Sequence, residues 1–282
     1  MAYLLLLPAF VFFVVFKFGA VLYLIPLSLE DWRLGSTTRA FVGLGNYRKL
    51  LVSTEFWNAL TNTIVYTVAV GVLSIALGLV LALAVRRSGR LQGIYQAVFF
   101  LPVAATMSAM AVVWRFIFDT NIGVLNAMAR AWGLSPLSWL QDDRLAMGAV
   151  VLIGVWSNMG YAMVLFLAGL TTISRDLYEA AAIDGASAPQ QFRAITWPLL
   201  SPVTLFVVII LTLRAVQAFD SIKVLTNGGP LGATQVLSHL LFQVGFQYFD
   251  TGFASTISVV FFLLLAGVTL LQMRVERRVH YQ

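Results

Sequence analysis

The stretch Glu179–Pro198, EAAAIDGASAPQQFRAITWP, lies between two long and almost uncharged apolar segments. A run of about 20 apolar residues is long enough to cross a membrane. A polar stretch between two such runs must therefore emerge on one side of the membrane. Its small and polar residues predict two short helices that meet at a sharp corner.

The first of these helices has recognisable start and stop signals. Ser174 is placed to cap it, and the carboxylates of Asp176 and Glu179 lie early in it, where they complement the positive end of a helix. Asp184 and Gly185 mark its end, because glycine tolerates the left-handed conformation that stops a helix.

The second helix is expected to begin at Ser187. Gln190 lies three residues on as a capping-box partner, and Pro189 falls in the first turn, where a proline is tolerated. Pro198 is expected to end this helix. A compact helical corner carried on a membrane domain is typical of a docking element.

The composition is that of an integral membrane protein. Of 282 residues, 60% are apolar and 11% are charged, with a mean hydropathy of +0.88, whereas soluble proteins contain about 25% charged residues. The net charge of +6 does not indicate nucleic acid, because Lys and Arg are scattered over segments at membrane edges. With no cysteine, and with His239 and His280 far apart, we expect no disulfide, metal site or cofactor.

Six apolar segments are long enough to span, and we expect an all-α membrane protein formed by one domain, residues 1–282. The expected spans are residues 3–26, 58–85, 94–118, 145–172, 199–221 and 251–272. Strands of a membrane β-barrel alternate in polarity over about ten residues, and these continuous runs exclude one.

Basic residues indicate how the chain is oriented. The segments after the second, fourth and sixth spans carry 8 Lys or Arg in 44 residues, and those after the first, third and fifth carry 7 in 86. Since cytoplasmic segments are enriched in Lys and Arg, we expect the first set, with both termini, in the cytoplasm. The cluster Arg86-Arg87-Ser88-Gly89-Arg90 is the clearest sign, and it places the loop 173–198 on the same side.

The chain lacks the residues of an ATPase or a hydrolase. No G-x-x-x-x-G-K-[ST] loop is present, and none of the three lysines, Lys17, Lys49 and Lys223, follows a glycine. The two histidines are not placed for a Ser/His/Asp set. We therefore expect no catalytic residues and a protein that is not an enzyme.

Arg214 is a charged residue within a span, where ionisable groups usually face protein or water. It lies 16 residues beyond Pro198, about 24 Å along a helix, in the outer half of the membrane. With Gln217 three residues on, it predicts a polar stripe facing a cavity and a contact with substrate. The alternative is a structural pair with Asp220 or with a neighbouring helix.

The fourth span contains Trp156, Asn158 and Tyr161, and the last two share one helix face. Aromatic rings beside an amide form the usual surface for a sugar, because the rings stack on C–H faces while the amide hydrogen-bonds to hydroxyls. The alternative is helix–helix packing, with the amide hydrogen-bonded across the interface.

At residues 173–198 the sequence resembles the membrane subunits of binding-protein-dependent ABC importers, whose EAA motif reads E-A-A-x-x-D-G-A-x-x-x-x-x-F-x-x-I-x-x-P. The matching residues are Glu179, Ala180, Ala181, Asp184, Gly185, Ala186, Phe192, Ile195 and Pro198. Further matches resemble carbohydrate-uptake permeases of the maltose and glycerol-3-phosphate type. They are Phe41–Leu51 (FVGLGNYRKLL), Phe219-Asp220, Thr226–Pro230 (TNGGP) and Glu276–Gln282 (ERRVHYQ).

This resemblance implies a type I ABC importer permease fold, in a bacterial or archaeal cytoplasmic membrane. It implies a pore of two permeases, usually different, with two cytoplasmic ABC ATPases and an extracytoplasmic solute-binding protein. The cargo would be a sugar (a mono- or oligosaccharide) or a polyol phosphate such as sn-glycerol 3-phosphate.

The resemblance also implies residue roles. Glu179 and Asp184 would make polar contacts in a cleft of the ATPase, and Gly185 would form the corner. Ala180, Ala181 and Ala186 would permit close packing, and Phe192 and Pro198 complete the ATPase-coupling motif. The positions that align with the pore-lining helices of the maltose permease are Trp156, Asn158, Tyr161 and Arg214, with Gln217 beside them.

The competing class is an ion-coupled secondary transporter of small polar solutes. Such proteins use buried carboxylates and often discontinuous helices. Asp220, at the edge of a span, is the one carboxylate that fits this pattern. A membrane anchor or scaffold with no transport role would not explain the loop at 173–198.

Overall fold

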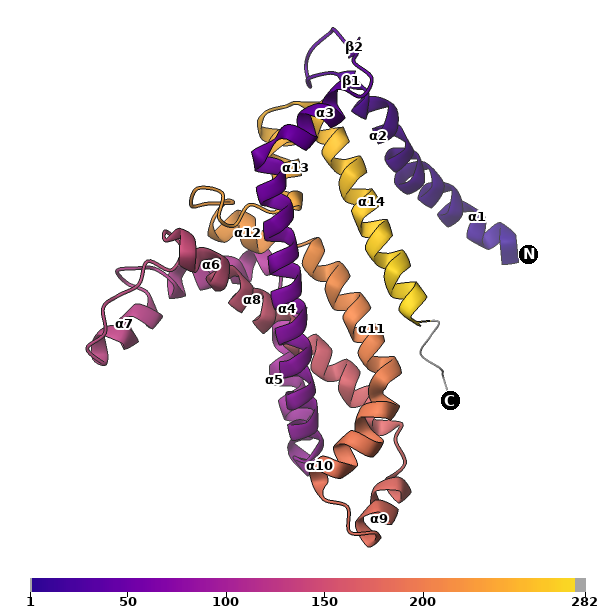
Figure 1. The fold of residues 1–282 in the computed structure, drawn as a ribbon, viewed down its shortest axis with the longest axis vertical. Coiled ribbons are helices and arrows are strands. Elements are labelled where there is room, and N and C mark those ends of the chain that lie inside the picture. The colour runs from indigo at the N-terminus through magenta and orange to yellow at the C-terminus, as the bar shows by residue number, and fades with distance from the viewer. Residues whose placement is uncertain (1, 277–282) are drawn as a thin grey trace.

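Long helices run through the body of the molecule (Figure 1). This computed structural model describes residues 2–276, and the side chains of residues 6–274. The helical stretches long and apolar enough to cross a membrane are Leu6–Ser28, Thr54–Arg86, Asp143–Thr171, Ala188–Leu225 and Thr251–Arg274. Each overlaps one of the spans expected from the sequence, although Ala188–Leu225 begins within the expected loop 173–198.

The N-terminal part forms the first two of these stretches. In order, its elements are α1 (Ala2–Phe13), the π-helical turn η1 (Val14–Gly19), α2 (Ala20–Ser28), β1 (Glu30–Asp31), β2 (Ala40–Phe41), α3 (Gly45–Val52) and α4 (Thr54–Arg86). The two short strands pair antiparallel, with Glu30 opposite Phe41.

The remaining elements build the rest of the bundle. They are η2 (Gly89–Leu91), α5 (Gln92–Ala104), α6 (Met107–Ile117), α7 (Val124–Ala131), α8 (Asp143–Thr171), α9 (Arg175–Ile183), α10 (Ala188–Gln191), η3 (Phe192–Thr196), α11 (Trp197–Val216), α12 (Asp220–Leu225), α13 (Leu237–Phe242), η4 (Gln243–Gln247) and α14 (Thr251–Glu276).

The third expected span, residues 94–118, is not one straight helix. The helix that ends at Ala104 and α6 meet at an angle of 98°, because Ala105 and Thr106 are extended, with ψ of 148° and 123°. Pro102 contributes to this early end, since it has no N–H for the carbonyl four residues before it. Counted as one broken span, the pair brings the number of candidate spans to six.

Pro198 does not end the second helix of the 173–198 loop, contrary to the sequence-based expectation. The helix continues from Ala188 through η3 to the end of α11 at Val216, and α12 follows after a short break at residues 217–219. The π-helical turn η3 directly before Pro198 is the physical reason: Trp197 N–H reaches back five residues to the carbonyl of Phe192. This wider turn accommodates the proline in the first turn of α11.

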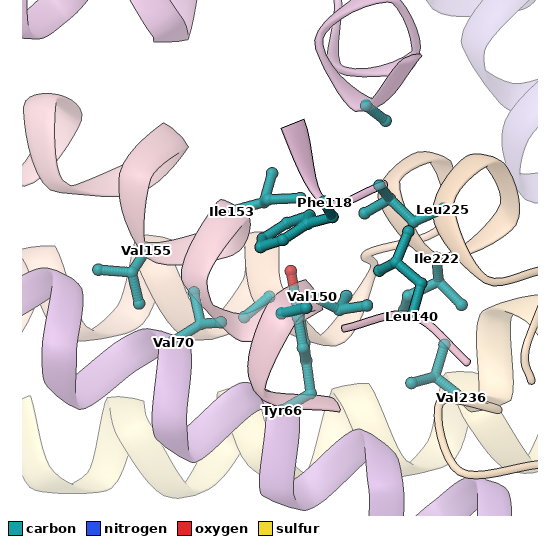
Figure 2. Close-up of a cluster of buried hydrophobic side chains, with 13 residues drawn as sticks. Tyr66, Val70, Phe118, Leu140, Val150, Ile153, Val155, Ile222, Leu225 and Val236 are labelled. Carbon is teal, nitrogen blue, oxygen red and sulfur yellow. The ribbon is translucent and has the colours of Figure 1, made fainter. Parts of the chain in front are cut away.

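The most extensive helix–helix contact in the bundle is that of α4 with α8, and small residues allow it. A Cβ atom on Gly78 would lie 2.5 Å from the Cβ of Ala162 and 3.0 Å from the backbone N of Met163. In membranes, such close backbone approach takes the place of the hydrophobic driving force that holds soluble helices together. Beside it, the buried cluster around Tyr66, Val70 and Ile153 joins α4 and α8 to the segment after α6 and to α12 (Figure 2).

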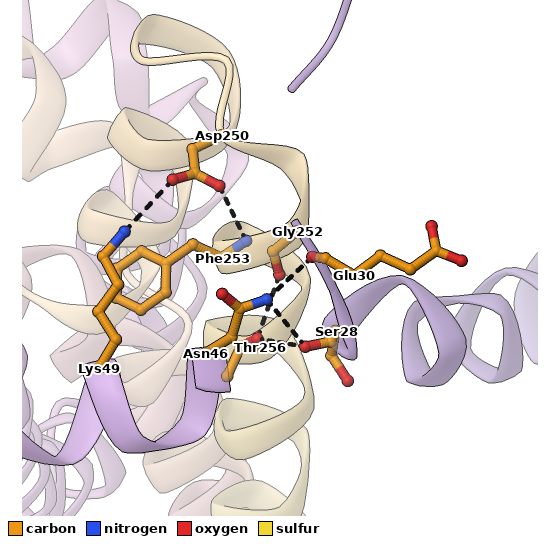
Figure 3. A network of polar contacts seen from close by, with 8 residues as sticks. All are labelled: Ser28, Glu30, Asn46, Lys49, Asp250, Gly252, Phe253 and Thr256. Atoms are coloured by element: carbon orange, nitrogen blue, oxygen red, sulfur yellow. Dashed lines mark hydrogen bonds and ion pairs between the residues drawn. The ribbon is translucent and has the colours of Figure 1, made fainter. Parts of the chain in front are cut away.

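A polar clamp ties residues 28–49 to residues 250–256 where α2, α3 and α14 meet (Figure 3). Asn46 Nδ2 donates to the carbonyls of Ser28 (3.1 Å) and Glu30 (2.9 Å), and Thr256 Oγ1 donates to the same Ser28 carbonyl (3.1 Å). Lys49 Nζ lies 3.5 Å from Asp250 Oδ2. These contacts hold the end of the first span, α2, against the beginning of the last one, α14 (Figure 1).

We predict that Gly78→Ala destabilises the bundle. Gly71→Ala, on the same helix, is the control and should not destabilise it. The new methyl at 78 meets Ala162, whereas a Cβ at 71 would meet no heavy atom within 4 Å. The expected loss is about 1–3 kcal/mol of unfolding free energy, read as a lower melting temperature of the purified protein in detergent. Equal melting temperatures of the two variants would show that the α4–α8 contact is loose.

Candidate functional site

Residues 174–186 fold as the sequence predicts. Ser174 Oγ accepts from Asp176 N–H at 3.2 Å and caps α9. At the other end, Ala186 N–H donates to the Ala181 carbonyl (2.9 Å), with Gly185 in the left-handed region at φ +78°. This pattern is the Schellman motif that ends helices at a glycine.

The second helix begins as predicted too. Gln190 Oε1 accepts from the Ser187 N–H at 2.7 Å, which is the backbone half of the capping box, and Pro189 lies in the first turn. Together α9, the corner and α10 form the α9–α10 hairpin, residues 174–198 with η3. It lies at one end of the molecule, beyond the end of α4 (Figure 1).

The two faces of α9 differ. Arg175, Tyr178, Glu179 and Ala182, spaced as one helix face, line a groove of about 880 Å³ against the end of α4 and the wall of α10 and η3. We call it the hairpin groove. One hydrogen bond, between the hydroxyls of Tyr178 and Thr196 at 2.9 Å, ties α9 to η3.

The motif residues are therefore brought together at one end of the molecule. The exposed ones are Glu179, Ala180, Asp184, Gly185 and Pro198, and the half-buried ones are Ala181, Ala186 and Phe192. Ile183, beside the corner, is 87% exposed. An apolar side chain this exposed at a rigid corner is suited to insertion into another protein. The sequence reasoning did not single it out, although it lies within the EAA motif.

A second cavity, the central cavity, lies inside the bundle with a volume of about 320 Å³. Of the residues that the sequence singled out, Asn158, Arg214 and Gln217 line it. Arg214 Nε donates to Asn158 Oδ1 at 3.0 Å, and the guanidinium lies over the ring of Tyr161, 5.1 Å from its centroid. Arg214 thus pairs with a residue of a neighbouring helix, Asn158 of α8, and not with Asp220. It also lines the cavity.

Trp156 and Tyr161 do not belong to the cavity lining. Trp156 packs edge-on against Trp114, with centroids 5.4 Å apart, so it has the packing role that the sequence left open. Tyr161 lies beneath the guanidinium of Arg214. Asp220 lines the cavity, and within the described side chains it forms no ion pair with Arg214.

Other lining residues were not anticipated. The break in the third span brings Pro102, Ala105 and Met107 to the cavity, beside Tyr66 and Ser221. Asn158 lies near the midpoint of α8, about 20 Å from either end of that helix. Non-helical backbone at membrane depth is tolerated where it lines a polar cavity, which fits the position of the break. Pro102 within an apolar run is the signal that could have predicted it.

The loop pocket, of about 500 Å³, lies between the start of α4 and the loop 226–235. Buried His239 holds this loop: its Nδ1 lies 2.7 Å from Gln235 Oε1, and its Nε2 lies 3.4 Å from Asn227 Oδ1. Burial, and then the positive charge of Lys223, lower the pKa of His239 to about 4. Leu231, at the tip of the loop, is 96% exposed.

The family model described as "Binding-protein-dependent transport system inner membrane component" matches residues 74–281. The chain belongs to this family. It is an ABC importer permease, a transport component that is not itself an enzyme, and ATP is hydrolysed by a separate subunit. The match to this family does not support the alternative of an ion-coupled secondary transporter.

Curated relatives match the permease over nearly its whole length. It is 36% identical to the probable ABC transporter permease protein YurN of Bacillus subtilis, covering 96% of this chain and 94% of the relative. It is 35% identical to the trehalose/maltose transport system permease protein MalF of Thermococcus litoralis (98% and 94%). The sn-glycerol-3-phosphate transport system permease protein UgpA of Agrobacterium fabrum is 33% identical (99% and 96%).

Solved structures show the same fold. A chain of a bacterial ABC transporter involved in the import of the acidic polysaccharide alginate has a TM-score of 0.87 at 21% identity, over 98% of this permease and 95% of that chain. A chain of the alginate transporter in complex with its pentasaccharide-bound periplasmic protein has a TM-score of 0.88, also at 21% identity, over 100% and 95%.

We predict that lowering the pH from 7 to 4.5 lowers the melting temperature of the permease more than that of His239→Gln. An unfolded histidine takes up a proton near pH 6.5, whereas the folded His239 does so only near pH 4. Its contribution to stability is therefore complete above pH 6.5 and is lost as the pH falls toward 4. Carboxylates titrate in both proteins, so the difference between the two curves isolates His239; parallel curves would contradict the prediction.

Proposed function

We propose that this permease forms half of the translocation pore of an ATP-driven importer for a sugar or related polyol phosphate. The observation that carries the proposal is one continuous helical run, Ala188–Val216, formed by α10, η3 and α11. It begins in the α9–α10 hairpin and carries Arg214, on the wall of the central cavity, 26 residues further on, about 39 Å away. A movement imposed on the hairpin is thus transmitted directly to the cavity.

The α9–α10 hairpin is the coupling element in this proposal. Glu179 and Asp184 make polar contacts in a cleft of the ATPase, and the small side chains of Ala180, Ala181 and Ala186 allow the close approach. Gly185 sets the corner, and Phe192 and Pro198 shape the helix that leaves it. The exposure of Ile183 and of the corner itself supports this role.

The central cavity is the place where the cargo passes. Asn158 and Gln217 offer amide groups for hydroxyls, and Arg214 offers the charge and the fork geometry that suit a phosphate. Tyr161 supports the guanidinium from below, and Trp156 stiffens the same helix through its contact with Trp114. The relatives named for trehalose/maltose and for sn-glycerol 3-phosphate support both cargo classes.

The assembly comprises a second, different permease, two cytoplasmic ATPases and an extracytoplasmic solute-binding protein. The assembly is located in a bacterial or archaeal cytoplasmic membrane, with both termini and the α9–α10 hairpin of the permease in the cytoplasm. The density of Lys and Arg on that side supports the orientation. ATP binding closes the two ATPases, the hairpins move with them, the pore opens outward to accept cargo, and hydrolysis returns it to the inward-facing state.

We predict that Glu179→Lys abolishes cargo-stimulated ATP hydrolysis in the assembled transporter while the permease still inserts. A lysine places the opposite charge at the proposed ATPase contact. Asp143→Lys, the same kind of reversal at the exposed start of α8, serves as the control and should leave coupling intact. ATPase assays on reconstituted complexes measure both. Normal coupled transport by Glu179→Lys would remove the basis for the coupling assignment.

We predict that Arg214→Gln weakens transport of a phosphate-bearing cargo by about tenfold to a hundredfold, in line with loss of a charge-assisted hydrogen bond. Transport of a neutral sugar should change far less. Uptake of sn-glycerol 3-phosphate and of maltose by proteoliposomes, each with its own binding protein, gives the comparison. Equal losses for the two solutes would show that Arg214 acts only by holding Asn158.

A further inference from the structure

The hairpin groove is lined in part by Glu179 and Phe192 of the coupling element, but it also has a basic wall that the proposed ATPase contacts do not involve. Its walls carry Arg86 and Arg87 from the end of α4 and Arg175 from α9, against one carboxylate, Glu179. Its apolar part is formed by Leu83 and by residues of the opposite wall such as Phe192. The groove therefore has a basic part, formed by the three arginines, and an apolar part, formed by residues such as Leu83 and Phe192.

The three arginines have no counter-charge of their own. Among the side chains of residues 6–274, the one ion pair within 4.0 Å joins Lys49 and Asp250, far from the groove. In the same part of the chain, no hydrogen bond leaves the guanidinium of Arg86, Arg87 or Arg175. Arg86 instead lies over the ring of Tyr178, 5.3 Å from its centroid. A cavity with a surplus of positive charge and free donors favours an anion.

The groove also lies at a defined depth. Arg86 is the last residue of α4, which has 33 residues and is about 50 Å long. A bilayer measures about 30 Å across its hydrocarbon and about 40–45 Å with its headgroups, so α4 is long enough to carry Arg86 to the level of the lipid headgroups. Basic pockets between helices at this level hold anionic headgroups, and an arginine fork fits a phosphate bidentately.

We propose that the hairpin groove binds the phosphate of an anionic phospholipid, held by Arg86, Arg87 and Arg175, with the start of its acyl chains against Leu83. The groove's volume of about 880 Å³ leaves room for more than a bare phosphate. Such a lipid bridges α4 and α9 and so anchors the α9–α10 hairpin to the membrane surface. A protein occupant is less well matched, because the apolar residues Leu177 and Ala180 lie on the opposite, exposed face of α9.

The test uses the complete transporter, with its ATPase and second permease. It is reconstituted in nanodiscs of phosphatidylglycerol and phosphatidylcholine and then released from them. Retained phosphatidylglycerol is counted per complex by mass spectrometry. The double variant Arg86→Gln/Arg87→Gln and the single variant Arg175→Gln, on opposite walls, should each retain less, by about fivefold for each arginine removed. Arg90→Gln is the matched control, because Arg90 belongs to the same basic cluster but does not line the groove.

Three results would overturn the proposal. Unchanged lipid retention in both groove variants would exclude the lipid site. An equal loss of lipid in Arg90→Gln would show that the basic loop attracts anionic lipid in general, without a specific site. Loss of the ATPase with unchanged lipid would reassign the groove to a protein contact. In a further arm, millimolar glycerophosphate should not displace the lipid; displacement would identify a site for a soluble phosphate.

Discussion

The close approach of α4 and α8 is the constraint on which the rest of this permease depends. It requires Gly78 on one helix, facing Ala162 and the backbone of Met163 on the other. The same pair supplies one wall of the central cavity, through Tyr66 and Asn158, and its far ends lead to the hairpin groove. Since apolar side chains gain little by leaving lipid for each other, this fit has to be geometric, and it leaves little freedom at the contact.

Arg214 shows how a structural contact and a functional one coexist in a single residue. Its Nε is engaged by Asn158 and its plane rests on Tyr161, which orients the charge and lowers the cost of placing it within the membrane. Among the described side chains, no other hydrogen bond engages the guanidinium, which lines the cavity. A residue held in this way is already positioned before a solute arrives, so binding loses little side-chain entropy.

Local features could be predicted from the sequence, and features set by neighbouring helices could not. Ser174, Gly185 and Gln190 act on backbone groups a few residues away. Their roles could therefore be predicted from the local sequence. Pro102 is a signal for the break at Ala105, but the 98° angle of that break is not written in the local sequence. The passage through Pro198 depends on the π-helical turn before it. The Arg214–Asn158 bond joins residues 56 positions apart; each was singled out, but their pairing is decided by how α11 packs on α8.

The α9–α10 hairpin stabilises its own corner, through its caps and its left-handed glycine, and one side-chain hydrogen bond ties α9 to η3. Its shape thus depends little on the identity of residues in the central cavity. Mutations that alter the cavity can accumulate without reshaping the corner, and the reverse also holds. The architecture is therefore modular in an evolutionary sense: a lineage can change its nutrient while keeping the same motor subunit.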